Sequence, residues 1–125
     1  MLSHHDAVAN IAVRDIAAAR HFYEGTLGLA VSGIVGKELV VYRSGHSTIF
    51  LYRSEYAGTN QATALTWPVG DKVDDMTRAL KAKGVRFEHY EMPQTHIEGD
   101  VHVAGERRIA WFKDPDGNIL SLVSG

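Results

Sequence analysis

Short apolar segments and one amphipathic segment occur in the same order in each half of the chain. Residues 8–14 (VANIAVR) and 62–69 (ATALTWPV) are apolar and bounded by polar residues, which is typical of strands. Each is followed by apolar residues at helical spacing, which in the first half are Ile16, Ala19 and Tyr23. The pattern therefore predicts a strand and then a helix at the start of each half.

The ends of both predicted helices carry the residues that such ends favour. Asp15 and Asp71 lie where an N-cap aspartate accepts hydrogen bonds from the amides of the first turn. Gly28 and Gly84 follow the last turns, where the left-handed conformation favours glycine. Asp71 and Gly84 each lie 56 residues after their counterparts. This shared offset indicates an internal repeat.

Each predicted helix leads into further strands. In the first half, residues 38–43 and 48–52 flank a short turn with the sequence SGH, a pattern that favours a hairpin. In the second half, residues 109–113 and 119–123 are joined by the sequence DPDGN. Proline suits the first corner of such a turn and glycine suits its left-handed position. Both halves are therefore predicted to be βαβββ modules.

The whole chain is expected to fold as a single α+β domain with modules at residues 8–53 and 62–124. The second module is longer because of residues 92–106, which are rich in turn-forming residues and are predicted to be a long loop. Connections of this length are uncommon and often serve as lids or binding loops. A lid that carries His96 and His102 is one interpretation, and a mobile surface excursion is the other.

The composition narrows the class of protein. The chain has 125 residues, of which 45% are hydrophobic and 22% charged, with a net charge of -2, as in an ordinary globular protein. No basic block is present, which argues against binding to nucleic acid or anionic membranes. The absence of cysteine excludes disulfides, iron–sulfur clusters and thiol nucleophiles. The sequence shows no signal-peptide pattern and no membrane-length apolar run, so we expect a cytoplasmic protein.

Two sequence blocks resemble a known family. The opening VRDIAAARHFYEGTLGL and the closing WFKDPDGNILSLV are similar to the start and end of modules in the vicinal-oxygen-chelate superfamily, which includes glyoxalases, bleomycin resistance proteins and dioxygenases. With the doubled module pattern, the resemblance covers nearly the whole chain. It implies that two modules curve their sheets around a cleft and that the protein is a homodimer.

The resemblance also implies where metal ligands would lie. Family members hold a divalent metal with four side chains on inward-facing strand positions. The matching residues here are Val8, Ala64, Ser121 and either Ile49 or Phe50. Aliphatic and phenyl side chains offer no lone pair, and a serine hydroxyl is a poor neutral ligand. We therefore expect no metal site and no cofactor.

If these positions face inward, strand alternation directs their neighbours into the same cleft. The expected pocket residues are Val8, Asn10, Ala12, Ala64, Thr66, Ile119 and Ser121. Such a lining is apolar with a few polar groups, which is typical of a site for an organic ligand. Alternatively, these small residues only let the two sheets pack together. Arg107 and Arg108 at the start of a strand either bind an anionic ligand group or form a solvated pair.

The leading hypothesis is metal-independent binding or sequestration of a small, largely apolar or aromatic molecule. A metal-free lyase or isomerase that uses His and Tyr acid–base chemistry is the first alternative, and a regulatory or interaction module without a small ligand is the second. No catalytic residue can be named from the sequence, and metal-dependent glyoxalase or dioxygenase activity is not expected. The expected partners are a small organic ligand and a second copy of the chain.

Overall fold

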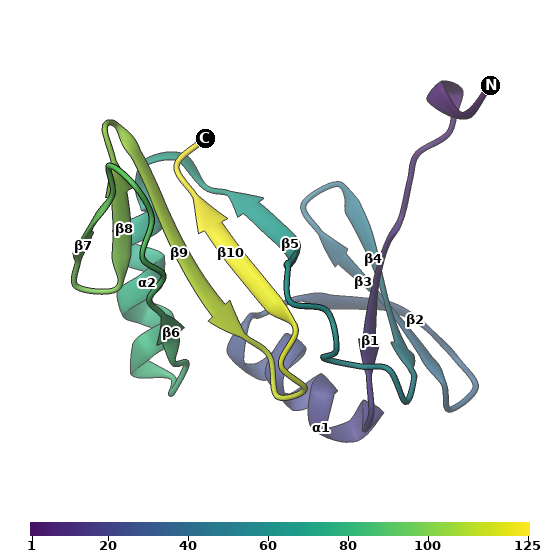
Figure 1. The fold of residues 1–125 in the computed structure, drawn as a ribbon. Coiled ribbons are helices and arrows are strands. Elements are labelled where there is room, and N and C mark those ends of the chain that lie inside the picture. The colour runs from purple at the N-terminus through teal and green to yellow at the C-terminus, as the bar shows by residue number, and fades with distance from the viewer. The chain divides into compact units, whose positions relative to one another are not determined.

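The computed structural model describes residues 1–125, which divide into two units, residues 1–59 and 60–125. Each unit consists of a β-sheet with a helix on one face (Figure 1). The predicted α+β class is confirmed, and the two predicted modules lie one in each unit. None of the helices has both the length and the apolar character needed to cross a membrane.

The first unit follows the predicted order of strand, helix and three strands. Its elements are η1 (Leu2–His4), β1 (Ala9–Val13), α1 (Ile16–Arg20), the π-helical turn η2 (His21–Thr26), β2 (Ala30–Val35), β3 (Leu39–Ser44) and β4 (Ser47–Arg53). The strand order in the sheet is β1-β4-β3-β2. The β1–β4 pair is parallel and the other two pairs are antiparallel.

Local sequence explains why these elements form where they do. The Asp15 carboxylate accepts a hydrogen bond from the Ala18 amide at 3.1 Å, which confirms the predicted N-cap of α1. The hairpin β3–β4 is also confirmed, and Gly45 occupies its turn with a φ of 57°. Ile11 and Val13 of β1 are buried on the side of the sheet that packs under α1, so alternate β1 residues face away from it.

The second unit contains a larger sheet. Its elements are β5 (Thr63–Pro68), the 3-10 turn η3 (Gly70–Lys72), α2 (Val73–Ala82), β6 (Phe87–Glu88), β7 (His96–Glu98), β8 (Val101–Ala104), β9 (Arg107–Lys113) and β10 (Ile119–Val123). The strand order is β5-β10-β9-β8-β7, and β6 also pairs with β9. Only the β5–β10 pair is parallel.

The core of this unit lies between α2 and one face of the sheet, as the ribbon shows (Figure 1). Val73 of α2 is buried against Ala110 of β9 and against two residues of β8, Val101 and Val103. Phe87 of β6 packs against this cluster. Ala110 pairs with Leu122 of β10, and Leu120 lies two positions away in the same strand. Both leucines therefore face the helix, as Ala110 does.

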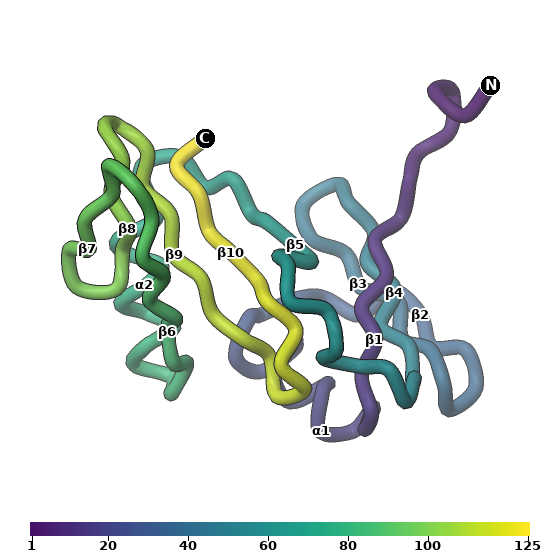
Figure 2. The backbone as a smooth tube through the Cα atoms, viewed as in Figure 1, coloured from purple at the N-terminus to yellow at the C-terminus, as the bar shows by residue number.

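The prediction of a long loop over residues 92–106 is wrong. These residues contain β7 and β8, which form a hairpin that extends the sheet beyond β9, and the traced backbone follows this path (Figure 2). The physical reason is the contribution of Val101 and Val103 to the core under α2. A run of three or four residues per strand is too short for its alternation to stand out in the sequence.

The predicted N-cap role of Asp71 is also wrong. Gly70, with a φ of 62°, starts a 3-10 turn that ends at Lys72, and α2 begins only at Val73. Lys72 occupies the N-cap position without a side-chain hydrogen bond to the first turn. The acidic residues Asp74 and Asp75 lie in that turn instead, where negative charge is favourable against the helix dipole.

Candidate functional site

The face of the second sheet opposite α2 carries a group of polar and aromatic side chains. Ser121 of β10 pairs with Thr66 of β5 on one side and with Trp111 of β9 on the other. The neighbours Leu120 and Leu122 point to the opposite face, since Leu122 pairs with the α2-facing Ala110. Ser121 and its two partners therefore share one face, which we call the helix-free face and which also carries His102.

A hydroxyl pair and an indole make up the centre of the helix-free face. The hydroxyl oxygens of Thr66 and Ser121 lie 2.8 Å apart and share a hydrogen bond, although Ser121 is only 2% exposed. Trp111 is half-buried, and its indole N–H donates to Thr63 Oγ1 at 3.2 Å. Because β10 lies between β9 and β5, the indole of Trp111 extends across β10 to reach Thr63. Its ring therefore lies beside the hydroxyl pair, which joins β5 to β10.

Two further rings surround the indole. His102 lies edge-on to Trp111 with ring centroids 4.8 Å apart, and Tyr90 lies edge-on at 5.3 Å. Such T-shaped contacts fix ring positions and contribute roughly 0.5–1.5 kcal/mol each beyond the area that they bury. Burial raises the pKa of Tyr90, so its hydroxyl stays protonated at neutral pH.

A backbone hydrogen bond holds the His102 ring in one orientation. It is 1% exposed, and its Nε2 accepts a hydrogen bond from the Tyr90 amide at 2.8 Å. An accepting Nε2 carries no proton, so the neutral ring carries its proton on Nδ1, which has no hydrogen-bond partner of good geometry. Burial lowers the pKa of His102 from its ordinary value of 6.5, and the nearby backbone of Ile109 offsets this only in part.

The buried neutral ring predicts a specific pH dependence of stability. The unfolded chain binds a proton at this position below about pH 6.5, whereas the folded chain does so only at lower pH. The free energy of unfolding is therefore expected to fall as the pH drops below about 6.5. His102→Gln keeps an acceptor for the Tyr90 amide but does not titrate, so its stability should depend less on pH.

Urea unfolding between pH 5 and 7 measures this difference. His46→Gln is the matched control, because His46 is exposed in the turn between β3 and β4. We expect the control to follow the wild-type pH dependence and His102→Gln to show a shallower one. Equal slopes for the wild type and His102→Gln would show that His102 takes up its proton equally in both states.

The β7–β8 turn is tied to α2 by charge. The Asp100 carboxylate accepts hydrogen bonds from Lys81 Nζ and His89 Nε2, each at 2.8 Å. The hydrogen bond from Lys81 has the largest effect on the pKa of Asp100 and that from His89 the next largest, and both hold this pKa below its usual range. These contacts position the strand that carries His102, because Asp100 immediately precedes β8.

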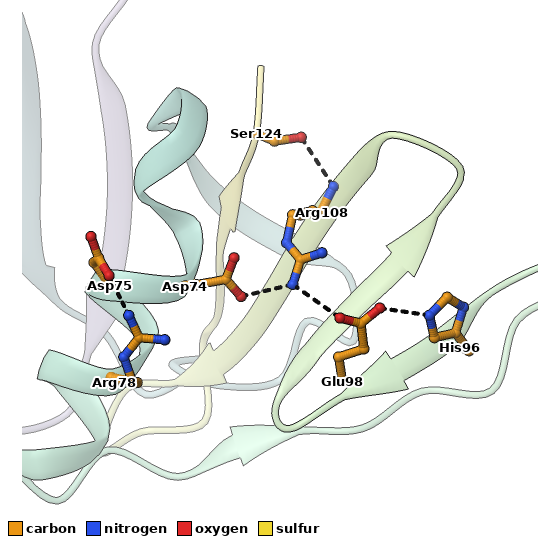
Figure 3. Close-up of polar contacts among 7 residues, drawn as sticks. All are labelled: Asp74, Asp75, Arg78, His96, Glu98, Arg108 and Ser124. Carbon is orange, nitrogen blue, oxygen red and sulfur yellow. Dashed lines mark hydrogen bonds and ion pairs between the residues drawn. The ribbon is translucent and has the colours of Figure 1, made fainter.

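Arg108 belongs to a second network, so it does not form a solvated pair with Arg107, and its binding of an anionic ligand group stays a prediction. Its Nη2 donates to Asp74 Oδ1 of α2 at 2.8 Å and lies 3.6 Å from Glu98 Oε1 of β7 (Figure 3). Glu98 in turn contacts His96 Nε2 at 2.7 Å, and His96 is the first influence that lowers the Glu98 pKa. Arg108 therefore connects α2 to the added hairpin, within which His96 contacts Glu98, and the lid role of His96 stays a prediction.

The predicted pocket residues of the second unit lie on or beside the helix-free face. Thr66 and Ser121 are on it, as is Ile119, two residues before Ser121 in the same strand. Ala64 is exposed and lies at a bulge, between the Ile119 pair and the Leu120 pair in the β5–β10 ladder. Ser121 is the one of these four whose hydroxyl is buried beside the indole.

The predicted pocket residues of the first unit are placed by β1. Asn10 is exposed and Ala12 half-buried on the face away from α1, while Val8 is exposed just before the strand begins. Asn10 pairs with Phe50, so Phe50 shares its face. Ile49 is 3% exposed and packs under α1, so of the two alternatives only Phe50 shares the face of the other predicted positions.

Sequence reasoning did not identify the ring cluster. It singles out neither Trp111 nor Tyr90, and it assigns His102 to a possible lid. Alternation along β9 contains the missing signal, because Trp111 has the opposite parity to the buried Ala110 and Phe112. The position of His102 depends on the β8–β9 register, which the sequence does not specify.

The donor set does not fit the metal that the family resemblance implies. The matching residues Val8, Phe50, Ala64 and Ser121 include no imidazole and no carboxylate. The structure contains no group of three or more His, Cys, Asp or Glu side chains arranged to hold a metal ion.

Comparisons with known proteins identify the family and the fold. The sequence profile described as Glyoxalase/Bleomycin resistance protein/Dioxygenase superfamily matches residues 4–122. No curated protein sequence matches the chain significantly.

Solved structures of the same fold resemble the chain over almost its full length. The fosfomycin resistance protein FosX from Listeria monocytogenes has a TM-score of 0.73 at 18% identity, covering 97% of this chain and 93% of that one. A mutant of that protein complexed with Mn(II) and 1S,2S-dihydroxypropylphosphonic acid has a TM-score of 0.73 at 19% identity, covering 100% and 92%. Lactoylglutathione lyase from Agrobacterium tumefaciens has a TM-score of 0.70 at 18% identity, covering 95% and 92%. With the profile match, these findings confirm the resemblance, and the chain belongs to the glyoxalase/bleomycin resistance protein/dioxygenase superfamily.

Proposed function

We propose that this protein binds a small, largely apolar or aromatic organic molecule on the helix-free face of the second sheet, without a metal ion. The single observation that carries the proposal is the half-buried Trp111 beside the Thr66–Ser121 hydroxyl pair. An aromatic surface with a few well-placed polar groups is the usual composition of a site for an organic ligand. The ligand is expected to contact the indole and to hydrogen-bond to Thr66.

The rings around Trp111 support binding more than catalysis. Tyr90 and His102 hold the indole by edge contacts, so little side-chain freedom is lost when a ligand binds. His102 is almost fully buried, and its accepting nitrogen is occupied by the Tyr90 amide. Its role is therefore to hold Trp111 in position. A metal-free lyase or isomerase would need its acid and base to reach the substrate directly.

The proposed lack of metal follows from the donor set. The solved FosX mutant contains Mn(II), whereas the four matching positions here offer hydrocarbon side chains and one hydroxyl. Since a divalent ion requires several nitrogen or oxygen donors converging on one point, these residues provide no such site. The proposal also retains the expected homodimer and cytoplasmic location, for which the family and the sequence are the support.

Titration with a flat neutral fragment, followed by ¹⁵N NMR, tests the proposal. We expect 2-naphthol in buffer with EDTA to shift the Trp111 indole N–H signal and the amides of Thr66 and Ser121. Supplying Zn²⁺ or Mn²⁺ in place of EDTA should leave the affinity unchanged. Binding that requires an added metal would contradict the proposal, as would shifts confined to other residues for every flat aromatic fragment tried.

A further inference from the structure

The first unit contains a groove of its own. It runs between α1 and the turn that joins β2 to β3, and its volume is about 520 Å³. Volumes of this size are typical of small-molecule sites. Its lining includes Arg14, Ile16, Ile34, Lys37, Val40 and Arg53.

The groove carries more positive than negative charge. Its lining includes four basic side chains but a single acidic one, Asp15, which already caps α1 through the Ala18 amide. Lys37 in the turn and Arg53 at the end of β4 are exposed, and neither forms an ion pair. Two cations from separate elements therefore face the same space without an acidic partner.

The other two basic side chains of the groove already have partners. Arg20 is held by Glu24, with Nε to Oε2 at 2.6 Å, and contributes less to the groove for that reason. Arg14 donates to the backbone carbonyl of Glu55 at 3.2 Å, so its guanidinium is already engaged. The positive charge that is left for a ligand is therefore that of Lys37 and Arg53.

The remaining lining of the groove is aliphatic. Ile34 of β2 is 54% exposed and Ile16 of α1 is half-buried, while Val40 of β3, which pairs with Ile34 and shares its face, is buried. An aliphatic surface beside unpaired cations suits a ligand that combines an apolar body with an anionic group. A neutral apolar ligand would leave the cations unused, and a small inorganic anion would leave the aliphatic surface unused.

We infer that this groove binds an amphiphilic organic acid, with its carboxylate at Lys37 and Arg53 and its apolar body along Ile34 and Ile16. The guanidinium of Arg53 matches the two oxygens of a carboxylate, and Lys37 adds a point charge. The site lies in the first unit and does not depend on the ligand proposed for the second sheet.

¹⁵N NMR titrations with octanoate and with 1-octanol test this inference, because the two probes share a chain and differ in charge. We expect octanoate to shift amides in residues 14–20 and 34–40 and the amide of Arg53. The neutral alcohol should bind at least about fivefold more weakly, because it lacks two exposed ion pairs.

The double variant Lys37→Glu with Arg53→Glu is expected to weaken octanoate binding roughly tenfold, since each exposed pair contributes only modestly. Arg43→Glu is the matched control, because Arg43 is exposed on β3 outside the groove and its replacement should leave octanoate binding unchanged. Equal affinities for octanoate and octanol, equal losses in both variants, or shifts confined to the second unit would overturn the inference. The 2-naphthol shifts on the second sheet stay as they are in either outcome.

Discussion

Asp114→Ala is expected to lower the free energy of unfolding by about 3 kcal/mol, because it leaves buried hydrogen-bond donors without partners. Asp114 is 4% exposed in the turn between β9 and β10. Its Oδ1 accepts from the amides of Asp116 at 3.0 Å and Asn118 at 2.8 Å, and its Oδ2 accepts from Asn118 Nδ2 at 2.8 Å. Urea denaturation followed by circular dichroism measures the change.

Asp114→Asn is the control that separates hydrogen bonding from packing. It has nearly the same volume and keeps one side-chain oxygen as an acceptor for the two amides. We expect it to lose about half as much stability as Asp114→Ala. A loss below about 1 kcal/mol for the alanine variant would show that water replaces the carboxylate in this turn.

The turn that contains Asp114 also shows why part of the fold is predictable from sequence. Proline at position 115 and glycine at 117, which adopts a φ of 96°, specify the turn by local chemistry alone. The predicted strand 119–123 is observed with those bounds, and the strand predicted at 109–113 begins two residues earlier, at Arg107. The Asp15 cap and the β3–β4 hairpin were predictable for the same reason.

Features that depend on distant partners were not predictable. The β7–β8 hairpin exists because Val101 and Val103 reach the core under α2, a contact between segments about 30 residues apart in sequence. α2 starts late because Gly70, with its positive φ, begins a 3-10 turn. The aspartate at position 71 does not distinguish this turn from the first turn of an α-helix. Short strands and helix boundaries of this kind have weak local signals.

The candidate site also has a part that local sequence predicts and a part that depends on distant partners. Alternation alone placed Thr66 and Ser121 on one face, because both lie in strands whose bounds were predicted well. The contribution of Trp111, Tyr90 and His102 depends on how β6, β8 and β9 pair across the sheet. Ring contacts across strands are set by register, and the sequence specifies register only where a tight turn does.

Ala64→Trp is expected to weaken 2-naphthol binding at least tenfold, or by about 1.4 kcal/mol, while leaving stability nearly unchanged. Ala64 is exposed in β5 beside Thr63, whose hydroxyl accepts from the Trp111 indole. A second indole there takes up the space that the ligand would occupy. Since no packed neighbour must move, the free energy of unfolding should change by no more than about 0.5 kcal/mol.

Ala79→Trp is the matched control for this substitution. Ala79 is exposed on α2, so the same change in volume occurs away from the helix-free face. The control should bind 2-naphthol as the wild type does, and the two variants should unfold at similar urea concentrations. If Ala64→Trp instead lost roughly 1–3 kcal/mol of stability, Ala64 would be close-packed rather than exposed. That outcome would remove the physical basis for placing a ligand beside Trp111, because the space assigned to the ligand would be filled by the protein itself.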